Sequence, residues 1–157
     1  MKILLLAIGK TDEEYLITGI KKYVGRLGHY VSFEMKEIPD IRNRKTLSEE
    51  QQKKAESFLL LQQLQLGDHV VLLDENGKQY TSVAFAETME KLMASGAKRI
   101  VFVIGGPYGF AQEVYDKADA KLSLSPMTFS HQMVRLVFVE QLYRAFTILK
   151  GEPYHHN

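Results

Sequence analysis

Short apolar runs alternate with longer amphipathic segments along this chain, and this alternation is the feature that most limits its fold. Apolar runs of about four to eight residues between turn residues are typical of buried strands, whereas apolar residues spaced three and four apart indicate helices. We expect strands at residues 2–8, 31–38, 69–74, 99–104 and 121–125. We expect helices at residues 13–27, 48–66, 82–95, 112–118 and 131–150. This alternation predicts an α/β fold with a mostly parallel sheet flanked by helices.

Length and composition indicate one globular domain spanning residues 1–157, because 45% of the residues are hydrophobic and 25% are charged. The absence of cysteine excludes a disulfide scaffold and a cysteine nucleophile, and it agrees with a cytoplasmic location. The net charge of +1 lacks the basic excess that often marks nucleic-acid binders, so any RNA contact must come from a local patch. No apolar run approaches the roughly 20 residues that span a bilayer, so we expect no membrane segment.

Two loops that follow predicted strands are candidate ligand sites. Gly105-Gly-Pro-Tyr-Gly109 follows the strand at 99–104, and glycine permits close backbone approach at the carboxyl end of a parallel strand. The loop lacks the spacing of a dinucleotide fingerprint, and a plain tight turn is the alternative. Asp74-Glu-Asn-Gly-Lys78 follows the strand at 69–74 and would emerge at the same sheet edge. Its Asn-Gly pair also fits a simple chain reversal.

A third candidate lies between the last predicted strand and the closing helix, at Leu122-Ser-Leu-Ser-Pro-Met-Thr-Phe129. Pro126 removes one backbone donor and favours an extended Ser125, so the backbone groups here need partners outside regular structure. Helix capping by Thr128 or Ser130 is the alternative. The basic loop at residues 39–47 is either a solvated connection or an RNA-phosphate contact.

The closing helix is apolar over so much of its surface that it either threads through the core or forms a dimer seam, and we favour a homodimer. Glu140 and Arg144 are four residues apart, as are His131 and Arg135, so each pair also fits a simple stabilising contact on the helix surface. In the tail, Tyr154-His-His156 is either a frayed end or a group suited to contact with a nucleobase. No metal-binding spacing is present, so we expect no metal.

Taken together and in this order, five segments resemble the ribosomal RNA large subunit methyltransferase H family: Leu73–Lys78, Phe102–Gly109, Leu122–His131, Arg135 with Glu140–Ala145, and Gly151–His155. The resemblance covers essentially the whole chain. It implies the SPOUT class of methyltransferases, a C-terminal trefoil knot and a homodimer. It also implies that S-adenosylmethionine lies in the knot and contacts the positions matching Leu73, Gly105, Leu124, Ser125, Pro126, Met127, Thr128 and Phe129.

The resemblance further implies methylation of N3 of a pseudouridine in large-subunit ribosomal RNA, on the assembled ribosome. An imide N–H is a poor nucleophile until its proton leaves, so the site needs a base or a cation that stabilises the anion. By resemblance, Arg144, Tyr154 and His155 lie near the target base, with the partner's tail reaching the site, and His131 and Arg135 are further candidates. We expect Arg144 to stabilise the deprotonated ring and Tyr154 or His155 to orient it.

Two other hypotheses stay open from the sequence. One is a SPOUT methyltransferase that acts on another RNA position, such as a site in transfer RNA. The other is a non-enzymatic, ribosome-associated module that binds a nucleotide through the same loops.

Overall fold

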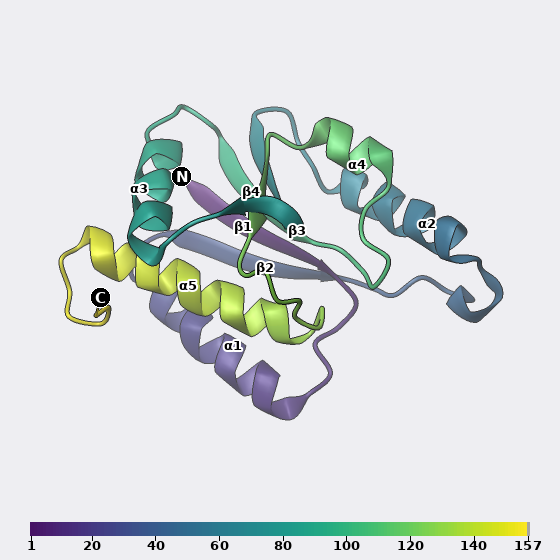
Figure 1. The fold of residues 1–157 in the computed structure, drawn as a ribbon, viewed down its shortest axis with the longest axis horizontal. Helices are drawn as coiled ribbons and strands as arrows, with labels where there is room; N and C mark the ends of the chain where they lie inside the picture. The colour runs from purple at the N-terminus through teal and green to yellow at the C-terminus, as the bar shows by residue number, and fades with distance from the viewer. Residues whose placement is uncertain (157) are drawn as a thin grey trace.

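The computed structural model describes residues 1–156 and shows one five-stranded sheet in the order β2-β1-β4-β3-β5, with every neighbouring pair parallel (Figure 1). The strands are β1 (Lys2–Ile8), β2 (Ser32–Ile38), β3 (Asp68–Gln79), β4 (Arg99–Ile104) and β5 (Ala120–Ser123). The helices are α1 (Glu14–Leu27), α2 (Glu49–Gln62), α3 (Ser82–Met93), α4 (Gln112–Lys117) and α5 (Met133–Leu149), with a short 3-10 turn at Arg44–Thr46. The predicted α/β class with a parallel sheet is confirmed.

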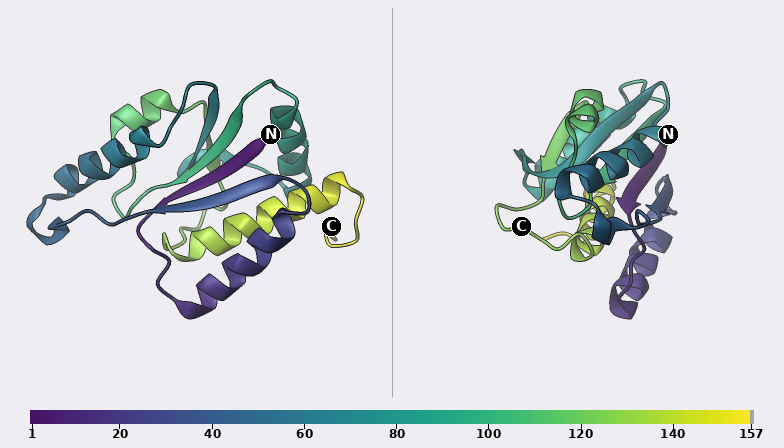
Figure 2. Two further views of the ribbon diagram at one scale, coloured as in Figure 1. Left: turned by 180° about the vertical axis from the view of Figure 1, so that it is seen from behind. Right: turned by 90° about the vertical axis from the view of Figure 1, so that its right-hand side faces the viewer.

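Helices cover both faces of the sheet, with α1, α3 and α5 on one face and α2 and α4 on the other (Figures 1 and 2). The strand β1 shows why, because its side chains alternate between two apolar clusters. Ile3 and Leu5 pack with α1, α3 and α5, whereas Leu4 and Leu6 pack with α2 and α4. A strand buried on both faces reads as the continuous apolar run seen in the sequence.

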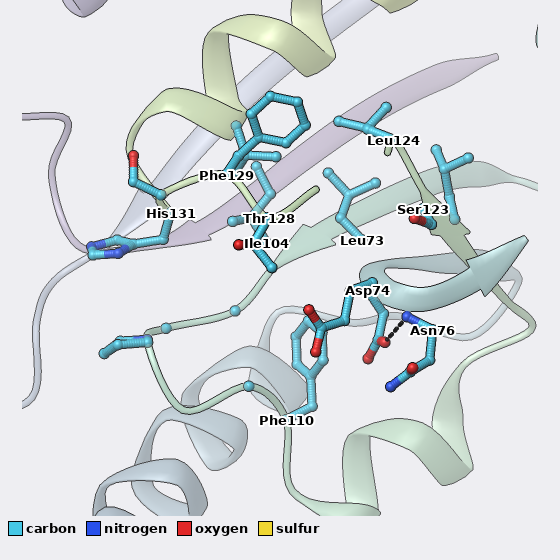
Figure 3. A pocket seen from close by; sticks show the side chains of 18 of the residues that line it. Leu73, Asp74, Asn76, Ile104, Phe110, Ser123, Leu124, Thr128, Phe129 and His131 are labelled. Carbon is cyan, nitrogen blue, oxygen red and sulfur yellow. Dashed lines mark hydrogen bonds between the residues drawn. The ribbon is translucent and has the colours of Figure 1, made fainter. Parts of the chain in front are cut away.

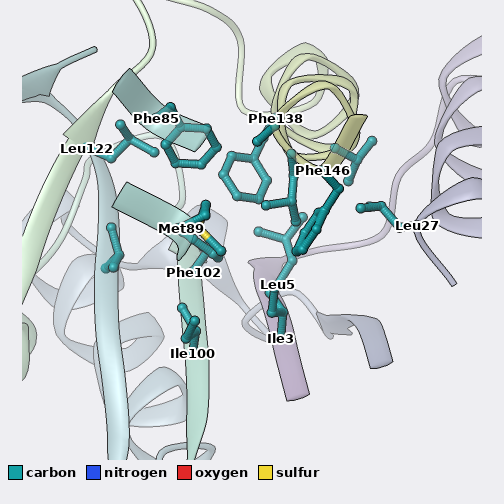
Figure 4. Packing of buried hydrophobic residues seen from close by; sticks show 14 of the residues in the cluster. Ile3, Leu5, Leu27, Phe85, Met89, Ile100, Phe102, Leu122, Phe138 and Phe146 are labelled. Carbon is teal, nitrogen blue, oxygen red and sulfur yellow. The ribbon is translucent and has the colours of Figure 1, made fainter. Parts of the chain in front are cut away.

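The helix α5 lies between α1 and α3 and over the sheet, with the centre of the Phe138 ring 4.7 Å from that of Phe102 and the two rings tilted by 50° (Figure 4). Its buried side chains are Arg135, Phe138, Val139, Leu142, Ala145, Phe146 and Thr147. None of the large apolar side chains of α5 is exposed. Packing within the chain therefore accounts for the broad apolar surface of this helix, and that surface does not by itself call for a dimer.

The simple chain reversal given as the alternative for Asn76-Gly77 does not occur, because this dipeptide lies inside β3. Leu73 and Lys78 both pair with Leu122, so the residues between them bulge out of the ladder. A Cβ atom at Gly77 would come within 2.7 Å of the Leu122 backbone, so only glycine fits there without displacement. The strand therefore continues to Gln79 instead of ending at residue 74.

The helix α2 has a capping box at its start and ends earlier than predicted. Ser48 accepts from the backbone N–H of Gln51, and the Gln51 side chain accepts from the backbone N–H of Ser48, so the two residues form a capping box. The helix ends at Gln62, earlier than the predicted residue 66. Across residues 1–156, no helix has both the length and the apolar character needed to cross a bilayer.

Candidate active site

A cavity of about 740 Å³ opens at the carboxyl ends of β3, β4 and β5 (Figure 3). Leu73 at the end of the regular part of β3 pairs with Ile104 at the end of β4, so the bulged segment after Leu73 and the glycine loop after Ile104 start side by side. Residues 105–110 and 122–131 complete the wall, together with Val134 of α5. The volume lies in the range of small-molecule and cofactor sites. The expectation that the two loops emerge at one sheet edge is confirmed.

All the predicted cofactor residues except Pro126 line this cavity. In Figure 3, Leu73, Leu124 and Phe129 lie on one side of the cavity, and Asp74 and Phe110 lie on the other. The strand β3 and the segment at 122–129 thus contribute apolar side chains to one wall.

The segment after β5 satisfies several of its own polar groups. Ser123 donates to the carbonyl oxygen of Ser125 over 3.1 Å, and the Ser125 hydroxyl accepts from the N–H of Met127 over 3.0 Å. Ser130 accepts from the N–H of Met133 over 3.0 Å and so caps α5. Capping by Thr128 or Ser130 was the alternative for this segment, and Ser130 is the residue that caps. The segment is therefore held in its curved shape from within.

The glycine loop is both a tight turn and a cavity wall. Gly109 donates its N–H to the carbonyl oxygen of Gly106 over 3.2 Å, and Gly109 has a φ of +79°, which favours glycine. The backbone of the loop also packs closely against two side chains. A Cβ at Gly105 would come within 3.0 Å of the Phe110 ring, and one at Gly106 would come within 2.5 Å of the Glu56 carboxyl.

Glu56 of α2 is a buried carboxyl group that the sequence analysis missed. It is 2% exposed, and its Oε2 accepts from Gln52 over 3.2 Å, whereas Oε1 has no hydrogen-bond partner within residues 1–156. Burial raises the pKa of this carboxyl group, and the Gln52 hydrogen bond opposes that rise. On the next residue, Ser57 accepts from the N–H of Ala111 over 3.0 Å, so α2 holds the glycine loop at both ends.

Asp74 fixes the bulge of β3 against α4. Its Oδ1 accepts from the N–H of Asn76 over 2.8 Å, and its Oδ2 accepts from the hydroxyl of Tyr115. Burial and this hydrogen bond to Asp74 raise the pKa of Tyr115 to about 12. Asp74 and Glu75 also line the cavity, so its wall carries acidic groups.

The predicted catalytic residues Arg144, Tyr154 and His155 form a second cluster around Glu140. Arg144 donates from Nη2 to Glu140 Oε1 over 2.6 Å and from Nη1 to His155 Nδ1 over 3.1 Å. Tyr154 donates to the same Glu140 oxygen over 2.9 Å, and the Arg144 guanidinium lies 4.8 Å from the centre of the Tyr154 ring. We call these four residues the tail cluster. The expected Glu140–Arg144 pair is confirmed, and it links the helix to the tail.

Two features of the tail cluster bear on its chemistry. Burial raises the pKa of Tyr154, with contributions from the hydroxyl of Tyr23 and from Glu140, so this phenol stays protonated at neutral pH. The Nε of Arg144 is buried and has no hydrogen-bond partner within the described part of the chain. Sequence reasoning did not assign Glu140 to the site, although its four-residue spacing from Arg144 was the available signal.

The tail cluster and the cavity lie apart in one copy of the chain. None of the four tail-cluster residues lines the cavity. Val134 lines it near the start of α5, and Arg144 is ten residues further on, which is about 15 Å along a helix. In Figure 1, the tail lies at the C-terminal end of α5, whereas the segment that precedes the helix lies at its N-terminal end. One chain therefore does not bring its two groups of predicted site residues together.

Arg135, a further candidate for contact with the target base, lies inside one copy of the chain and is held by backbone groups. Its side chain is fully buried, and its guanidinium donates to the carbonyl oxygens of Ile8 and Gly9 over 2.7 and 2.8 Å and to Glu37 over 3.2 Å. Its Nε donates to the carbonyl oxygen of His131 over 3.0 Å. Arg135 thereby ties the start of α5 to the end of β1, whereas His131 itself is exposed and lines the cavity.

In the basic loop at residues 39–47, Nη1 of Arg44 lies 3.2 Å from Oδ1 of Asp40, so Arg44 forms an ion pair within the loop.

Within residues 1–156, no group of three or more His, Asp or Glu side chains is placed to hold a metal ion.

A parallel α/β sheet with a cofactor-sized cavity at its carboxyl edge and a C-terminal helix beside that cavity suits a methyltransferase of the SPOUT class. Residues 1–155 match the family model described as "Predicted SPOUT methyltransferase". Similar curated relatives are named ribosomal RNA large subunit methyltransferase H. Those of Parabacteroides distasonis, Christiangramia forsetii and Flavobacterium johnsoniae are 59%, 61% and 59% identical to this chain, over 99% of each chain. The chain belongs to the SPOUT methyltransferases and, within them, to the ribosomal RNA large subunit methyltransferase H family.

Proposed function

We propose that this chain transfers a methyl group from S-adenosylmethionine to N3 of a pseudouridine in large-subunit ribosomal RNA, in the cytoplasm and on the assembled ribosome. The observation that carries the proposal is the convergence of the two candidate loops and the segment after β5 on one cavity of cofactor size. The names of the relatives supply the class of RNA. The single domain of residues 1–157 would act as a homodimer.

The residues around the cavity fit S-adenosylmethionine. Leu73, Leu124 and Phe129 offer apolar surface for an adenine ring, and the glycine loop offers backbone at close approach. Asp74 and Glu75 add carboxylates to the lining of the same cavity, which favours a cationic ligand. When bound, S-adenosylmethionine supplies a methyl group that is already activated by its sulfonium.

The tail cluster supplies what the acceptor nitrogen needs. Removal of the N3 proton leaves an anionic ring, and the guanidinium of Arg144 is a permanent cation that stabilises it. The side chain of Arg144 is partly exposed, so an anionic ring can approach its guanidinium. Glu140 holds Arg144 and Tyr154 in one orientation, and the protonated Tyr154 orients the base as a hydrogen-bonding group.

The separation of about 15 Å along α5 supports a site shared between two copies. In a symmetric dimer, the tail cluster of one copy can face the cavity of the other, and both sites are then completed by the same contact. The glycine loop, the segment at 122–129 and α5 all border the cavity, and we propose that they form the trefoil knot of the SPOUT class. Chains avoid knots in general, so ligand binding is the reason to keep one here.

The experiment is to incubate the protein with S-adenosylmethionine labelled in its methyl group, together with whole ribosomes or free ribosomal RNA, and to map the labelled nucleoside. We expect label on N3 of a large-subunit pseudouridine, with ribosomes as the better substrate. Label on another RNA position, such as a transfer RNA site, would contradict the proposed substrate. Cofactor binding without transfer to any RNA would favour a non-enzymatic module.

A further inference from the structure

Exposed apolar side chains gather at the opening of the cavity. Among the described residues, Tyr108, Met127 and Phe129 line the cavity and yet are 43%, 78% and 40% exposed. A side chain that lines a cavity while facing solvent lies at its opening. Lys53 and His131 line the same cavity, and Nζ of Lys53 also lies 3.2 Å from Oε2 of Glu50.

Tyr108 is the member of this rim that the proposed function does not use. Met127 and Phe129 belong to the segment assigned to the cofactor, whereas Tyr108 is the fourth residue of the glycine loop. Its side chain makes no hydrogen bond, ion pair or ring contact with any other part of residues 1–156. A large exposed aromatic ring without a partner at a binding site marks a contact surface for a ligand.

The loop holds this ring on a rigid support. Pro107 fixes its own φ before Tyr108, and the hydrogen bond from Gly109 to Gly106 closes the turn behind it. Glu56 packs against the underside of Gly106. A ring presented on such a turn loses little conformational entropy when it binds a partner.

We propose that the ring of Tyr108 is a stacking platform for an unpaired base of the RNA substrate, next to the acceptor nucleotide. This inference rests on the proposed function, since the acceptor must reach the cavity that holds the methyl donor. Bases in single-stranded RNA stack on exposed aromatic side chains, and nearby cations bind the adjoining phosphates. Tyr108 with Lys53 provides this combination at one cavity, and His131 adds a hydrogen-bonding ring to its lining.

Steady-state kinetics at saturating S-adenosylmethionine, with ribosomes as the varied substrate, test the platform. Tyr108→Ala should raise KM for the ribosome by about 5- to 150-fold, which corresponds to stacking of one base at about 1–3 kcal/mol. Tyr108→Phe keeps the ring and should restore KM to within about threefold of wild type. Calorimetry should give a Kd for S-adenosylmethionine that Tyr108→Ala changes by less than about twofold, since the adenine contacts lie elsewhere.

Tyr15→Ala is the matched control, because Tyr15 is a 60% exposed tyrosine on α1 that does not line the cavity. Its KM for the ribosome should equal that of wild type. An equal KM in Tyr108→Ala and Tyr15→Ala would overturn the platform while leaving the proposed function intact. Loss of cofactor affinity or of the dimer in Tyr108→Ala would also overturn it. A wild-type protein that methylates no RNA would overturn the proposed function and, with it, this inference.

Discussion

The carboxyl group of Glu56 lies directly beneath Gly106, so closely that a Cβ at residue 106 would come within 2.5 Å of either carboxyl oxygen. One oxygen accepts from Gln52, and the other has no partner in residues 1–156. A buried carboxylate with an unsatisfied oxygen is costly, and the cost falls when the group binds a proton. The wall of the cofactor cavity is therefore supported by a carboxyl group that resists ionisation.

This burial predicts a stability that depends on pH. The pKa of Glu56 is raised in the folded chain above its ordinary value of 4.5 by burial and by Asp40, against the opposing effects of Gln52 and Arg44. Between the unfolded and the folded pKa the folded state binds more protons, so the free energy of unfolding falls as pH rises through that window. Glu56→Gln mimics the protonated carboxyl group and should remove the fall in the free energy of unfolding with rising pH. The variant should therefore be more stable than wild type at neutral pH.

Urea unfolding at a series of pH values measures this difference. Glu50→Gln is the control, since Glu50 is on the same helix and its side chain is 63% exposed. We expect the stability gap between Glu56→Gln and wild type to widen with rising pH, and the gap for Glu50→Gln to stay nearly constant. A Glu56→Gln gap that does not change with pH would show that Glu56 ionises freely in the folded chain.

The bulge of β3 predicts a sharp difference between two glycine substitutions. Gly77→Ala places a Cβ 2.7 Å from the backbone of Leu122, so β3 and β5 must separate and the cavity wall at Leu124 must shift. We expect a loss of stability of about 1–3 kcal/mol, as for overpacked sites, and weaker binding of S-adenosylmethionine. Thermal unfolding and calorimetry measure the two effects.

Gly25→Ala is the matched control for this prediction. Gly25 lies within α1, and a Cβ there meets nothing within 4 Å. Alanine in a helix interior stabilises by about 0.5–1 kcal/mol relative to glycine. Stability gains in both variants would mean that the bulge at Gly77 has room for a side chain.

The position of Arg144 in the tail cluster predicts that replacing it lowers the rate of methyl transfer without weakening the binding of S-adenosylmethionine. Arg144→Ala should reduce the rate of methyl transfer by about 100- to 1,000-fold, the usual effect of losing one group that stabilises an anion. The Kd for S-adenosylmethionine should stay within about twofold of wild type, because Arg144 does not line the cavity. Single-turnover kinetics and calorimetry provide the two readouts.

Arg26→Ala serves as the control for Arg144→Ala. Arg26 lies 5.5 Å from the ring centres of Tyr23 and Tyr143 and donates no hydrogen bond to Glu140. It should transfer methyl groups at a rate close to that of wild type. Equal loss of transfer and of cofactor binding in Arg144→Ala would show that Arg144 does not act on the acceptor.

The fold was predictable from the sequence because its signals are local. Residues 2–8 and 99–104 are continuous apolar runs with turn residues after them, and the structure places strands at those bounds. The bulge at Asp74–Gly77 was not predictable, because the Asn-Gly pair suits a turn as well as a bulge. Whether the chain turns or bulges there depends on Leu122, which is distant in sequence and pairs with both ends of the bulge.

The site was predictable only in part, for a similar reason. The spacing of Glu140 and Arg144 indicated their pair, whereas the addition of Tyr154 and His155 came from a resemblance and depends on how the tail folds back. Arg135 looked like a surface residue four positions from His131. Its burial depends on the free carbonyl groups at the end of β1, and no local pattern reports these.

The central claim is that the cavity of one copy works with the tail cluster of another. Two variants test it, Arg144→Ala and Thr128→Arg. Thr128 is exposed and lines the cavity, so an arginine there should block the cationic cofactor without unfolding the chain. Each variant alone should fail to methylate ribosomes, the first for lack of the cation and the second for lack of the methyl donor.

The decisive measurement is the methylation rate after the two inactive variants are unfolded together and refolded as an equal mixture. Half of the dimers would then be mixed, and each mixed dimer would hold one intact cavity facing one intact tail cluster. We predict a recovery of about a quarter of the wild-type rate, as two-fold symmetry requires. A mixture that forms mixed dimers and stays as inactive as its components would contradict the shared site.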